Sequence, residues 1–175
     1  MDRRSLERSL ARRLLDHIDH QTTDMADSCL EVACETYTSP QRHVEELNVL
    51  FLEQPIVLCM SGALPGPNTF LAIEICETPI LLTRDAEGRV RALLNSCRHR
   101  GAKVADGMGT VRTFVCPFHA WTYNVDGSLR GMPVANAFAG MCKQDKGLVE
   151  LPVEEGYGLI VGRLRPGPEV DIDAY

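Results

Sequence analysis

The first 52 residues carry apolar side chains at helical spacing. From residue 5 to residue 20, leucines and an isoleucine recur every three or four positions, which predicts an amphipathic helix with Ser5 as its cap and an arginine-rich exposed face. A polar stretch follows. Ser39-Pro40 then predicts the start of a second helix that runs to about Leu52, because proline is favoured at the first helical position. We therefore expect a helical N-terminal arm over residues 1–52.

After this arm the pattern changes to short segments that are alternating or rich in β-branched residues, separated by turn residues. Asp85–Gly88 and Asp126-Gly127 predict hairpin loops. The pattern predicts a mainly antiparallel β domain over residues 53–165, followed by a linker over residues 166–175. The expected strands cover residues 55–61, 69–76, 79–84, 90–94, 113–116, 121–124, 128–130 and 158–164.

Composition and charge narrow the class of protein. The chain has 175 residues, of which 45% are hydrophobic, and a net charge of −6, so bulk nucleic-acid binding is not expected. The longest apolar run, residues 56–60, is far shorter than the roughly 20 residues that a membrane span needs. Seven widely spaced cysteines argue against a disulfide framework and for thiols or metal ligands. We expect a soluble, cytoplasmic protein.

Two cysteine and histidine pairs form the candidate metal site. Cys97 and His99 are separated by one residue, Cys116 and His119 by two, and sixteen residues lie between His99 and Cys116. Each pair follows a predicted strand, so a tight loop can turn both side chains toward one point, where thiolate and imidazole bind iron or zinc. A structural zinc site usually pairs Cys with Cys and His with His. One residue of each type per loop fits that pattern poorly.

The residues around these pairs carry a resemblance to a known family. Residues 97–101 and 116–123, followed by Asp126-Gly127 and Leu129 to Pro133, resemble the two cluster loops in the N-terminal Rieske 2Fe-2S domain of the large (α) subunit of aromatic-ring-hydroxylating oxygenases. This resemblance implies a Rieske-type antiparallel β-sandwich that follows the helical arm. One departure is Ala120, where the family usually has glycine. If that position needs a positive φ, we expect Ala120 to be strained.

The resemblance also implies roles for the four residues. Cys97 and Cys116 would hold one iron of a Rieske-type 2Fe-2S cluster as thiolates, and His99 and His119 would hold the outer iron as neutral imidazoles. The exposed histidines would then be where electrons enter or leave. In the family this domain takes electrons from a reductase or ferredoxin and passes them to a mononuclear non-haem iron, which belongs to a neighbouring subunit of a homotrimer. The products arise by mono- or dioxygenation in aromatic compound catabolism.

The catalytic domain of that family is not expected within this chain. Its mononuclear iron is held by two histidines and a carboxylate, yet no histidine follows His119, so no catalytic residue is assigned here. The chain is therefore expected to be a fragment or one part of a split gene, and to act as an oxidoreductase only together with an oxygenase catalytic domain. The alternatives are a stand-alone Rieske ferredoxin-like electron carrier and a structural zinc module.

Residues near the four ligands raise further expectations. Trp121 is expected mainly to pack behind the second loop, and Tyr123 to hydrogen-bond toward a cluster sulfur. Pro133 either covers the cluster or simply makes a turn. The residues around the two pairs carry a local excess of positive charge, which can form a docking collar for an acidic electron donor. Alternatively, these basic side chains simply face water on the loops or pair with carboxylates elsewhere. The residues that carry this charge are Arg98, Arg100, Lys103 and Arg112.

Other cysteines and histidines are expected to have no role in metal binding. His17 and His20 lie near acidic residues but are read as a solvated helix face, and His43 is expected to be exposed. Cys59 and Cys76 lie in apolar strands and are expected to be buried thiols.

Overall fold

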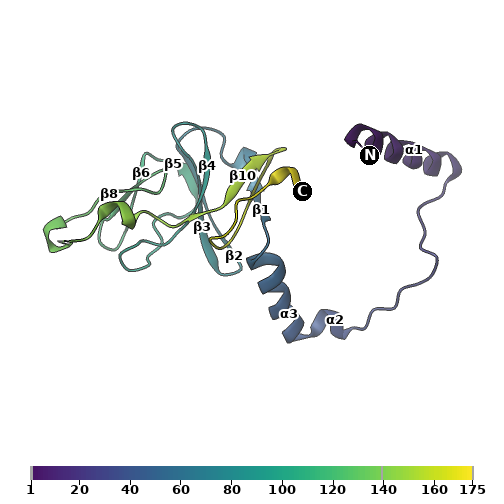
Figure 1. The fold of residues 1–175 in the computed structure, drawn as a ribbon, viewed down its shortest axis with the longest axis horizontal. Helices are drawn as coiled ribbons and strands as arrows, with labels where there is room; N and C mark the ends of the chain where they lie inside the picture. Colours follow the sequence, from purple (N-terminus) through teal and green to yellow (C-terminus); the bar gives the residue numbers. More distant parts are fainter. Residues whose placement is uncertain (1, 139, 175) are drawn as a thin grey trace. The chain divides into compact units, whose positions relative to one another are not determined.

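The computed structural model describes residues 2–138 and 140–174, and it divides the chain into two compact units, Met1–Ser39 and Pro40–Tyr175. None of the helices within these described ranges has both the length and the apolar character that crossing a bilayer requires. The second unit carries all of the strands (Figure 1).

The first unit consists mainly of helix α1, Arg3–His20, with every one of its residues at least partly exposed. The helix begins earlier than the sequence predicts. Asp2 is the cap, because its carboxylate accepts the backbone N–H of Ser5 at 3.0 Å and the Ser5 hydroxyl at 2.8 Å. The expectation that Ser5 caps the helix was therefore wrong, since Asp2, three residues earlier, is the cap and Ser5 lies inside the first turn. A four-residue helix, α2 (Glu35–Thr38), was not predicted.

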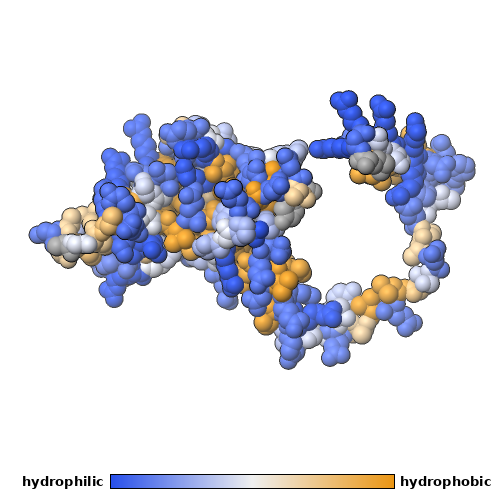
Figure 2. All heavy atoms as spheres, viewed as in Figure 1, coloured by the Kyte–Doolittle hydropathy of each residue, from blue (hydrophilic) through white to orange (hydrophobic). Residues whose placement is uncertain are grey.

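The second unit opens with the helix that Ser39-Pro40 predicts. It consists of α3, Pro40–Glu46, and continues as a π-helical segment, η1, Leu47–Leu52. The end at Leu52 agrees with the sequence pattern, whereas the wider π turn carried no sequence signal. Apolar side chains gather on this helix (Figure 2), where Val44, Leu50 and Phe51 are exposed.

Three antiparallel sheets follow, in the orders β1-β11-β10, β5-β2-β3-β4-β9 and β6-β7-β8. All eight predicted strands are present within one or two residues of their expected ends. The three strands that the pattern missed, β5, β9 and β10, are two to four residues long and form by pairing with β2, β4 and β11, respectively. The strands are β1 (Ile56–Met60), β2 (Thr69–Ile75), β3 (Thr78–Arg84), β4 (Val90–Leu94), β5 (Met108–Thr110), β6 (Thr113–Val115), β7 (Thr122–Asn124), β8 (Leu129–Gly131), β9 (Glu150–Leu151), β10 (Val153–Gly156) and β11 (Leu159–Gly162).

Strand β3 lies at the centre of the sandwich and is buried on both faces. Leu81 packs into one hydrophobic cluster with the two site cysteines, while Ile80 and Leu82 pack into a second cluster around strands β1 and β11. Because side chains alternate along a strand, one strand serves both cores. This arrangement confirms the expected β-sandwich and places the candidate site on the first of the two cores.

Two polar clusters hold the hairpins in place. The buried carboxylate of Asp85 accepts the backbone N–H groups of Glu87 and Arg89, and it pairs with the guanidinium of Arg91 at 3.1 Å. This confirms the predicted hairpin after β3. At the base of that hairpin, Arg84 binds Glu155 of β10 through two hydrogen bonds of 2.8 and 2.7 Å.

The last described residues pack against the β domain. A short 3-10 turn, Ile172–Ala174, lies within residues 166–175, which the sequence analysis expected to be a linker, and Ile172 is buried. The backbone N–H of Ile172 donates to the carboxylate of Glu154 at 2.8 Å, and its side chain lies close to Gly156.

Candidate metal centre

Strands β4 and β6 each lead into one of the two predicted loops, and the two loops close in the same way. The N–H of Cys97 donates to the carbonyl of Ala102 at 2.8 Å, and the N–H of Gly101 donates back to the carbonyl of Cys97 at 2.8 Å. The N–H of Cys116 donates to Trp121 at 2.8 Å, and that of Ala120 to Cys116 at 2.9 Å. Each cysteine is therefore fixed by a pair of backbone hydrogen bonds across its own loop.

The shared closure requires a left-handed residue four positions after each cysteine. Gly101 adopts φ 80° there, and Ala120 adopts φ 55°. The expectation about Ala120 is confirmed, because an L-residue with a Cβ in this region costs roughly 1–2 kcal/mol relative to glycine.

Both cysteines are deeply buried, with 4% of Cys97 and 2% of Cys116 exposed. The phenol oxygen of the buried Tyr123 lies 3.3 Å from the sulfur of Cys97 and accepts the N–H of Arg98 at 3.0 Å. Burial and the hydrogen bond with Cys97 raise the pKa of Tyr123, so its phenol keeps its proton. When Cys97 is a thiolate, Tyr123 is therefore the donor of the hydrogen bond to its sulfur. The sequence analysis expected Tyr123 to form a hydrogen bond toward a cluster sulfur.

The two histidines lie side by side but differ in their surroundings. Their ring centroids are 4.6 Å apart. His99 is half-buried and stacks on the indole of Trp121, with centroids 5.0 Å apart and an interplanar angle of 7°. His119 is exposed and contacts the half-exposed ring of Phe118, at 4.1 Å. The sequence analysis expected both to be exposed, which is wrong for His99 because Trp121 covers one face of its ring.

The chemistry of these four side chains fits a Rieske centre. The Nδ1 atom of His99 is buried and has no hydrogen-bond partner, which is a costly state that a metal ion would relieve. Desolvation lowers the pKa of His99, and the charges of His119 and Arg100 lower it further, which favours the neutral imidazole that a metal ligand requires. Two buried thiols beside two imidazoles match the donor set of that centre.

Within the described residues, no three His, Cys, Asp or Glu side chains are grouped so that they could hold one metal ion together. A Rieske centre does not need such a group, because each of its two irons takes only two protein ligands.

Asn95, which sequence reasoning missed, fixes the loop before the first ligand. It is buried, and its amide oxygen accepts the N–H groups of Val104 and Ala105, while its amide nitrogen donates to the Ala105 carbonyl at 2.8 Å. A buried amide with several partners joins the two ends of the first loop. The sequence offers one signal for it, a polar residue directly after an apolar strand and two positions before Cys97.

A second residue that sequence reasoning missed is Phe138. Its ring meets His99 edge-on, with centroids 5.6 Å apart, and meets Trp121 edge-on at 5.5 Å. Pro133 is exposed in a turn five residues earlier. The sequence gives no signal for this contact, because Phe138 is distant from both loops along the chain.

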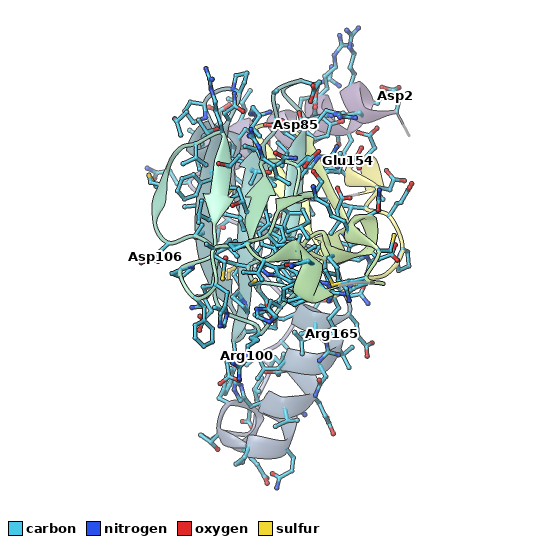
Figure 3. All side chains as sticks on the ribbon, turned by 90° about the vertical axis from the view of Figure 1, so that its left-hand side faces the viewer. Asp2, Asp85, Arg100, Asp106, Glu154 and Arg165 are labelled. Atoms are coloured by element: carbon cyan, nitrogen blue, oxygen red, sulfur yellow. The ribbon has the colours of Figure 1, made fainter. Side chains whose placement is uncertain are left out.

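The basic residues near the site divide into two groups. Arg98, Arg100 and Arg112 are exposed, and the Arg100 guanidinium lies over the ring of Phe118 at 5.4 Å. Lys103, in contrast, forms an ion pair with Glu74 of β2 at 2.7 Å. Its charge is therefore neutralised locally. Figure 3 shows Arg100 and Asp85 at opposite ends of the β domain, which places the two loops at one end of the sandwich.

The structure also describes the surroundings of the remaining candidate histidines and cysteines. His17 contacts Asp24 and Thr22, each at 2.9 Å, and His43 is exposed as expected. Cys59 and Cys76 are only half-buried, so the expectation of fully buried thiols was wrong. Cys76 is half-buried because it occupies the two-residue turn between β2 and β3 with φ 47°.

Comparisons with known proteins agree with this geometry. A family model described as Rieske [2Fe-2S] domain matches residues 54–150. The large subunit of anthranilate 1,2-dioxygenase from Acinetobacter baylyi is 36% identical over 106 residues, which cover 59% of this chain and 22% of that protein. The α subunit of biphenyl 2,3-dioxygenase from Rhodococcus jostii is 32% identical over 142 residues, which cover 79% of this chain and 30% of that protein.

Solved structures show the same fold. A naphthalene 1,2-dioxygenase from Rhodococcus sp., bound to indole, has a TM-score of 0.72 and 32% identity over 78% of this chain and 32% of its own. A quaternary ammonium Rieske monooxygenase that oxidises carnitine has a TM-score of 0.74 and 27% identity over 80% of this chain and 38% of its own. The chain therefore spans less than two fifths of the length of each of these relatives.

Proposed function

Because this chain belongs to the Rieske [2Fe-2S] domain family, we propose that it is the electron-transfer domain of the large subunit of a non-haem iron ring-hydroxylating oxygenase. The observation that carries the proposal is the pair of loops with identical backbone closure, which bring two buried thiols and two adjacent imidazoles to one end of the sandwich. A bound Rieske cluster supplies one-electron chemistry, at a potential between roughly −150 and +300 mV.

The two cysteines and the two histidines would bind different irons of the cluster. Cys97 and Cys116 would hold the inner iron in the buried core, and His99 and His119 would hold the outer iron toward the surface. The burial of the thiols and the partial exposure of the imidazoles support this division. Tyr123 would stabilise the charge on the Cys97 sulfur through its phenol proton.

The electron donor is proposed to be an acidic reductase or ferredoxin. Arg98 and Arg100, in the first loop, and Arg112, just before β6, are exposed in a chain whose total charge is −6. Such local charge attracts an oppositely charged partner and speeds its encounter. The exposed ring of Phe118 beside Arg100 adds the apolar contact that interfaces usually contain near their centre.

The acceptor is proposed to be a mononuclear iron in an oxygenase catalytic domain. Its usual ligands are two histidines and a carboxylate, and no histidine follows His119 in this sequence. Mono- or dioxygenation would therefore take place outside these 175 residues. In a homotrimer the receiving iron would belong to the neighbouring subunit. A cytoplasmic location is consistent with the seven cysteines, all of which are free thiols.

Cluster assembly tests this proposal directly. The chain is supplied with iron and sulfide, and its iron content, its acid-labile sulfide and the EPR spectrum of the reduced form are measured. We expect two irons and two sulfides per chain and the low average g value of a Rieske centre. Cys116→Ser should abolish the cluster, whereas Cys59→Ser, which changes a thiol away from the site, should leave it intact. A colourless protein that binds zinc instead would contradict the proposal.

A further inference from the structure

Helix α1 carries an apolar face that stays exposed. Its apolar side chains recur every three or four positions, and a helix turns by about 100° per residue, so they lie along one side of the helix. A continuous row of exposed apolar side chains indicates a surface that another surface covers. We call this row the apolar stripe. Its members, each between 45% and 63% exposed, are Leu6, Leu10, Leu14, Leu15 and Ile18.

Charge is distributed unevenly along the same helix. Residues 3–13 contain five arginines and one acidic residue, Glu7. Residues 14–20 contain two aspartates, Asp16 and Asp19, and neither lysine nor arginine. One half of α1 is therefore basic and the other half is acidic. The arginines of the basic half are Arg3, Arg4, Arg8, Arg12 and Arg13.

This order of charges is unfavourable for a helix on its own. Unpaired N–H groups leave positive charge at the start of a helix and unpaired carbonyls leave negative charge at its end, so acidic residues are favoured first and basic residues last. The first turn of α1 instead contains Arg3 and Arg4 and no acidic residue, and Asp19 lies in the last turn. A neighbour with the opposite charge at each end would therefore stabilise α1.

Ion pairs within the first unit do not remove this separation of charge. Arg3 pairs with Glu7 and Arg13 with Asp24, each at 3.0 Å, and all four side chains are at least 60% exposed. Pairs as exposed as these contribute little to stability and still face any partner. Asp24 also contacts His17 at 2.9 Å, on the acidic half of the helix.

A second copy of α1 that lies antiparallel matches the apolar stripe with itself. The stripe is symmetric about residue 12, because Leu10 and Leu14 are equally distant from it, and so are Leu6 and Ile18. When Leu10 of one copy faces Leu14 of the other, Leu6 therefore faces Ile18 at both ends of the pair. Each apolar side chain of this row then has an apolar side chain opposite to it.

The same register brings opposite charges together. Arg4, Arg8 and Asp19 all lie on the flank of the stripe marked by Leu15, since they are separated by close to whole turns of the helix. The two-fold axis of an antiparallel pair brings each flank against the same flank of the second copy. Asp19 then lies beside Arg4 and Arg8 of the other helix, and this contact occurs twice.

We propose that α1 is a self-association helix, which pairs antiparallel with α1 of a second copy of this chain through the apolar stripe and through contacts of Asp19 with Arg4 and Arg8. The inference goes beyond the proposed function, because α1 lies outside residues 54–150, which match the Rieske family. A two-fold pair cannot be formed by a three-fold axis. In a symmetric homotrimer, the pairing would therefore join subunits of two different trimers.

A membrane surface is the other occupant to which a basic amphipathic helix points. Helices that lie on anionic bilayers carry basic residues on the polar face and are held by attraction to the lipid headgroups. The acidic half of α1, with Asp16 and Asp19, would be repelled by such a surface. A second copy matches both halves, so the charges favour self-association.

Sedimentation velocity of the full chain, over a hundredfold range of concentration, tests the pairing. We expect a reversible equilibrium of monomer and dimer. Leu10→Ala/Leu14→Ala should raise the dissociation constant at least tenfold, because it removes the central contacts while alanine keeps the helix. Every residue of α1 is at least partly exposed, so this variant leaves the cores of the β domain intact.

Leu30→Ala is the matched control, because Leu30 is an exposed leucine of the same unit outside α1. It should leave the dissociation constant within twofold of that of the unchanged protein. A chain that stays monomeric at every concentration would overturn the proposal. A dimer that forms equally well in Leu10→Ala/Leu14→Ala would overturn it too.

Charge variants test the antiparallel register. Asp19→Arg should weaken the dimer at least fivefold, because the new arginine lies beside Arg4 and Arg8 of the second copy. An arginine in the last turn favours the isolated helix, so this loss cannot come from unfolding of α1. Arg4→Glu/Arg8→Glu/Asp19→Arg exchanges the signs and should return the dissociation constant to within threefold of the original. Failure of the exchange to restore the dimer would overturn the register.

Salt and vesicles separate the remaining outcomes. Antiparallel pairing brings opposite charges together, so the dissociation constant should rise with ionic strength. Parallel pairing would bring like-charged halves together, so a dimer that salt strengthens would overturn the antiparallel direction. Vesicles of phosphatidylcholine and phosphatidylglycerol probe the membrane. A dimer that does not bind them supports the proposal, whereas a monomer that binds them through the apolar stripe would overturn it.

Discussion

Gly101 and Ala120 occupy equivalent places in the two ligand loops. Each donates its backbone N–H to the carbonyl of the cysteine four positions earlier, at 2.8 and 2.9 Å, and each adopts a positive φ, 80° and 55°. Glycine takes this conformation at little cost, but alanine does not. The second loop therefore carries backbone strain that the first loop lacks.

Ala120→Gly should stabilise the protein. The relief of strain, about 1–2 kcal/mol, exceeds the extra entropy that glycine gives the unfolded chain, so the free energy of unfolding should rise by about 0.5–1 kcal/mol. Denaturant titration of the assembled protein measures this. Gly101→Ala is the reciprocal variant and should lower the same free energy by about 0.5–1 kcal/mol, because the strain it adds is partly offset by the lower entropy of the unfolded chain. A loss of stability in Ala120→Gly would show that the left-handed conformation costs nothing here.

Tyr123→Phe should lower the midpoint potential of the cluster. The variant removes the phenol proton 3.3 Å from the Cys97 sulfur, and hydrogen bonds to a cluster sulfur stabilise its reduced, more negative form. It also leaves the Arg98 N–H without its partner, which should cost about 1–2 kcal/mol of stability. Potentiometric titration followed by visible absorption tests the shift. Tyr157→Phe, an exposed tyrosine bound to Asp173, should leave the potential unchanged.

His119→Cys should keep a cluster but lower its potential. Replacing an imidazole by a thiolate adds negative charge to the outer iron, which disfavours reduction. The same potentiometric titration and the EPR spectrum measure the result. His43→Cys, an exchange at an exposed position outside the site, is the control and should change neither. If the potential of His119→Cys equalled that of the unchanged protein, His119 would not be a ligand.

Reversal of charge at Arg98 and Arg100 should slow reduction by an acidic ferredoxin or reductase. Attraction between exposed charges weakens with salt, so the rate for the unchanged protein should fall steeply as ionic strength rises. In the double variant Arg98→Glu/Arg100→Glu, the rate at low salt should fall about tenfold or more and lose most of its salt dependence. Lys103→Gln/Glu74→Gln, which removes both partners of an exposed ion pair and leaves the net charge unchanged, should change the rate little. A reduction rate that does not change with ionic strength would contradict the proposal that these arginines form a docking surface.

Asp85 should make stability depend on pH. Burial opposes its ionisation, but the N–H of Arg89 and the guanidinium groups of Arg91 and Arg89 outweigh that effect, so the pKa of Asp85 lies below its usual 3.8. A carboxyl whose pKa is lower in the folded state stabilises the fold above its unfolded pKa, and this stabilisation is lost as the pH falls through the folded pKa.

Asp85→Asn should therefore be destabilised by about 2 kcal/mol at pH 7 and should lose less stability than the unchanged protein between pH 5 and pH 3. Denaturant titration at several pH values measures both effects. Asp126→Asn, which replaces an exposed turn carboxylate, is the matched control. A parallel pH profile in Asp85→Asn would show that Asp85 titrates alike in the folded and unfolded chains.

The sequence by itself determined the features that are local along the chain. The spacing of Cys97, His99, Cys116 and His119 predicted the metal-binding type, because ligands on tight loops are fixed by their own neighbours. Alternating or β-branched apolar residues predicted eight of the strands, and turn residues predicted the hairpins after β3 and β7. The left-handed strain at Ala120 also followed from one departure within a loop.

Only the tertiary structure decided the features that depend on contacts between distant segments. Strands β5, β9 and β10 carry no apolar alternation in the sequence, and they form because β2, β4 and β11 provide their hydrogen-bond partners. Lys103 was predicted to belong to the basic surface, but folding brings it to Glu74, with which it forms an ion pair. His99 and His119 look alike in the sequence, yet Phe138, 39 positions after His99, makes them unequal. Periodicity and spacing report neighbours along the chain, whereas the surroundings of a ligand are set by residues that meet only when the chain folds.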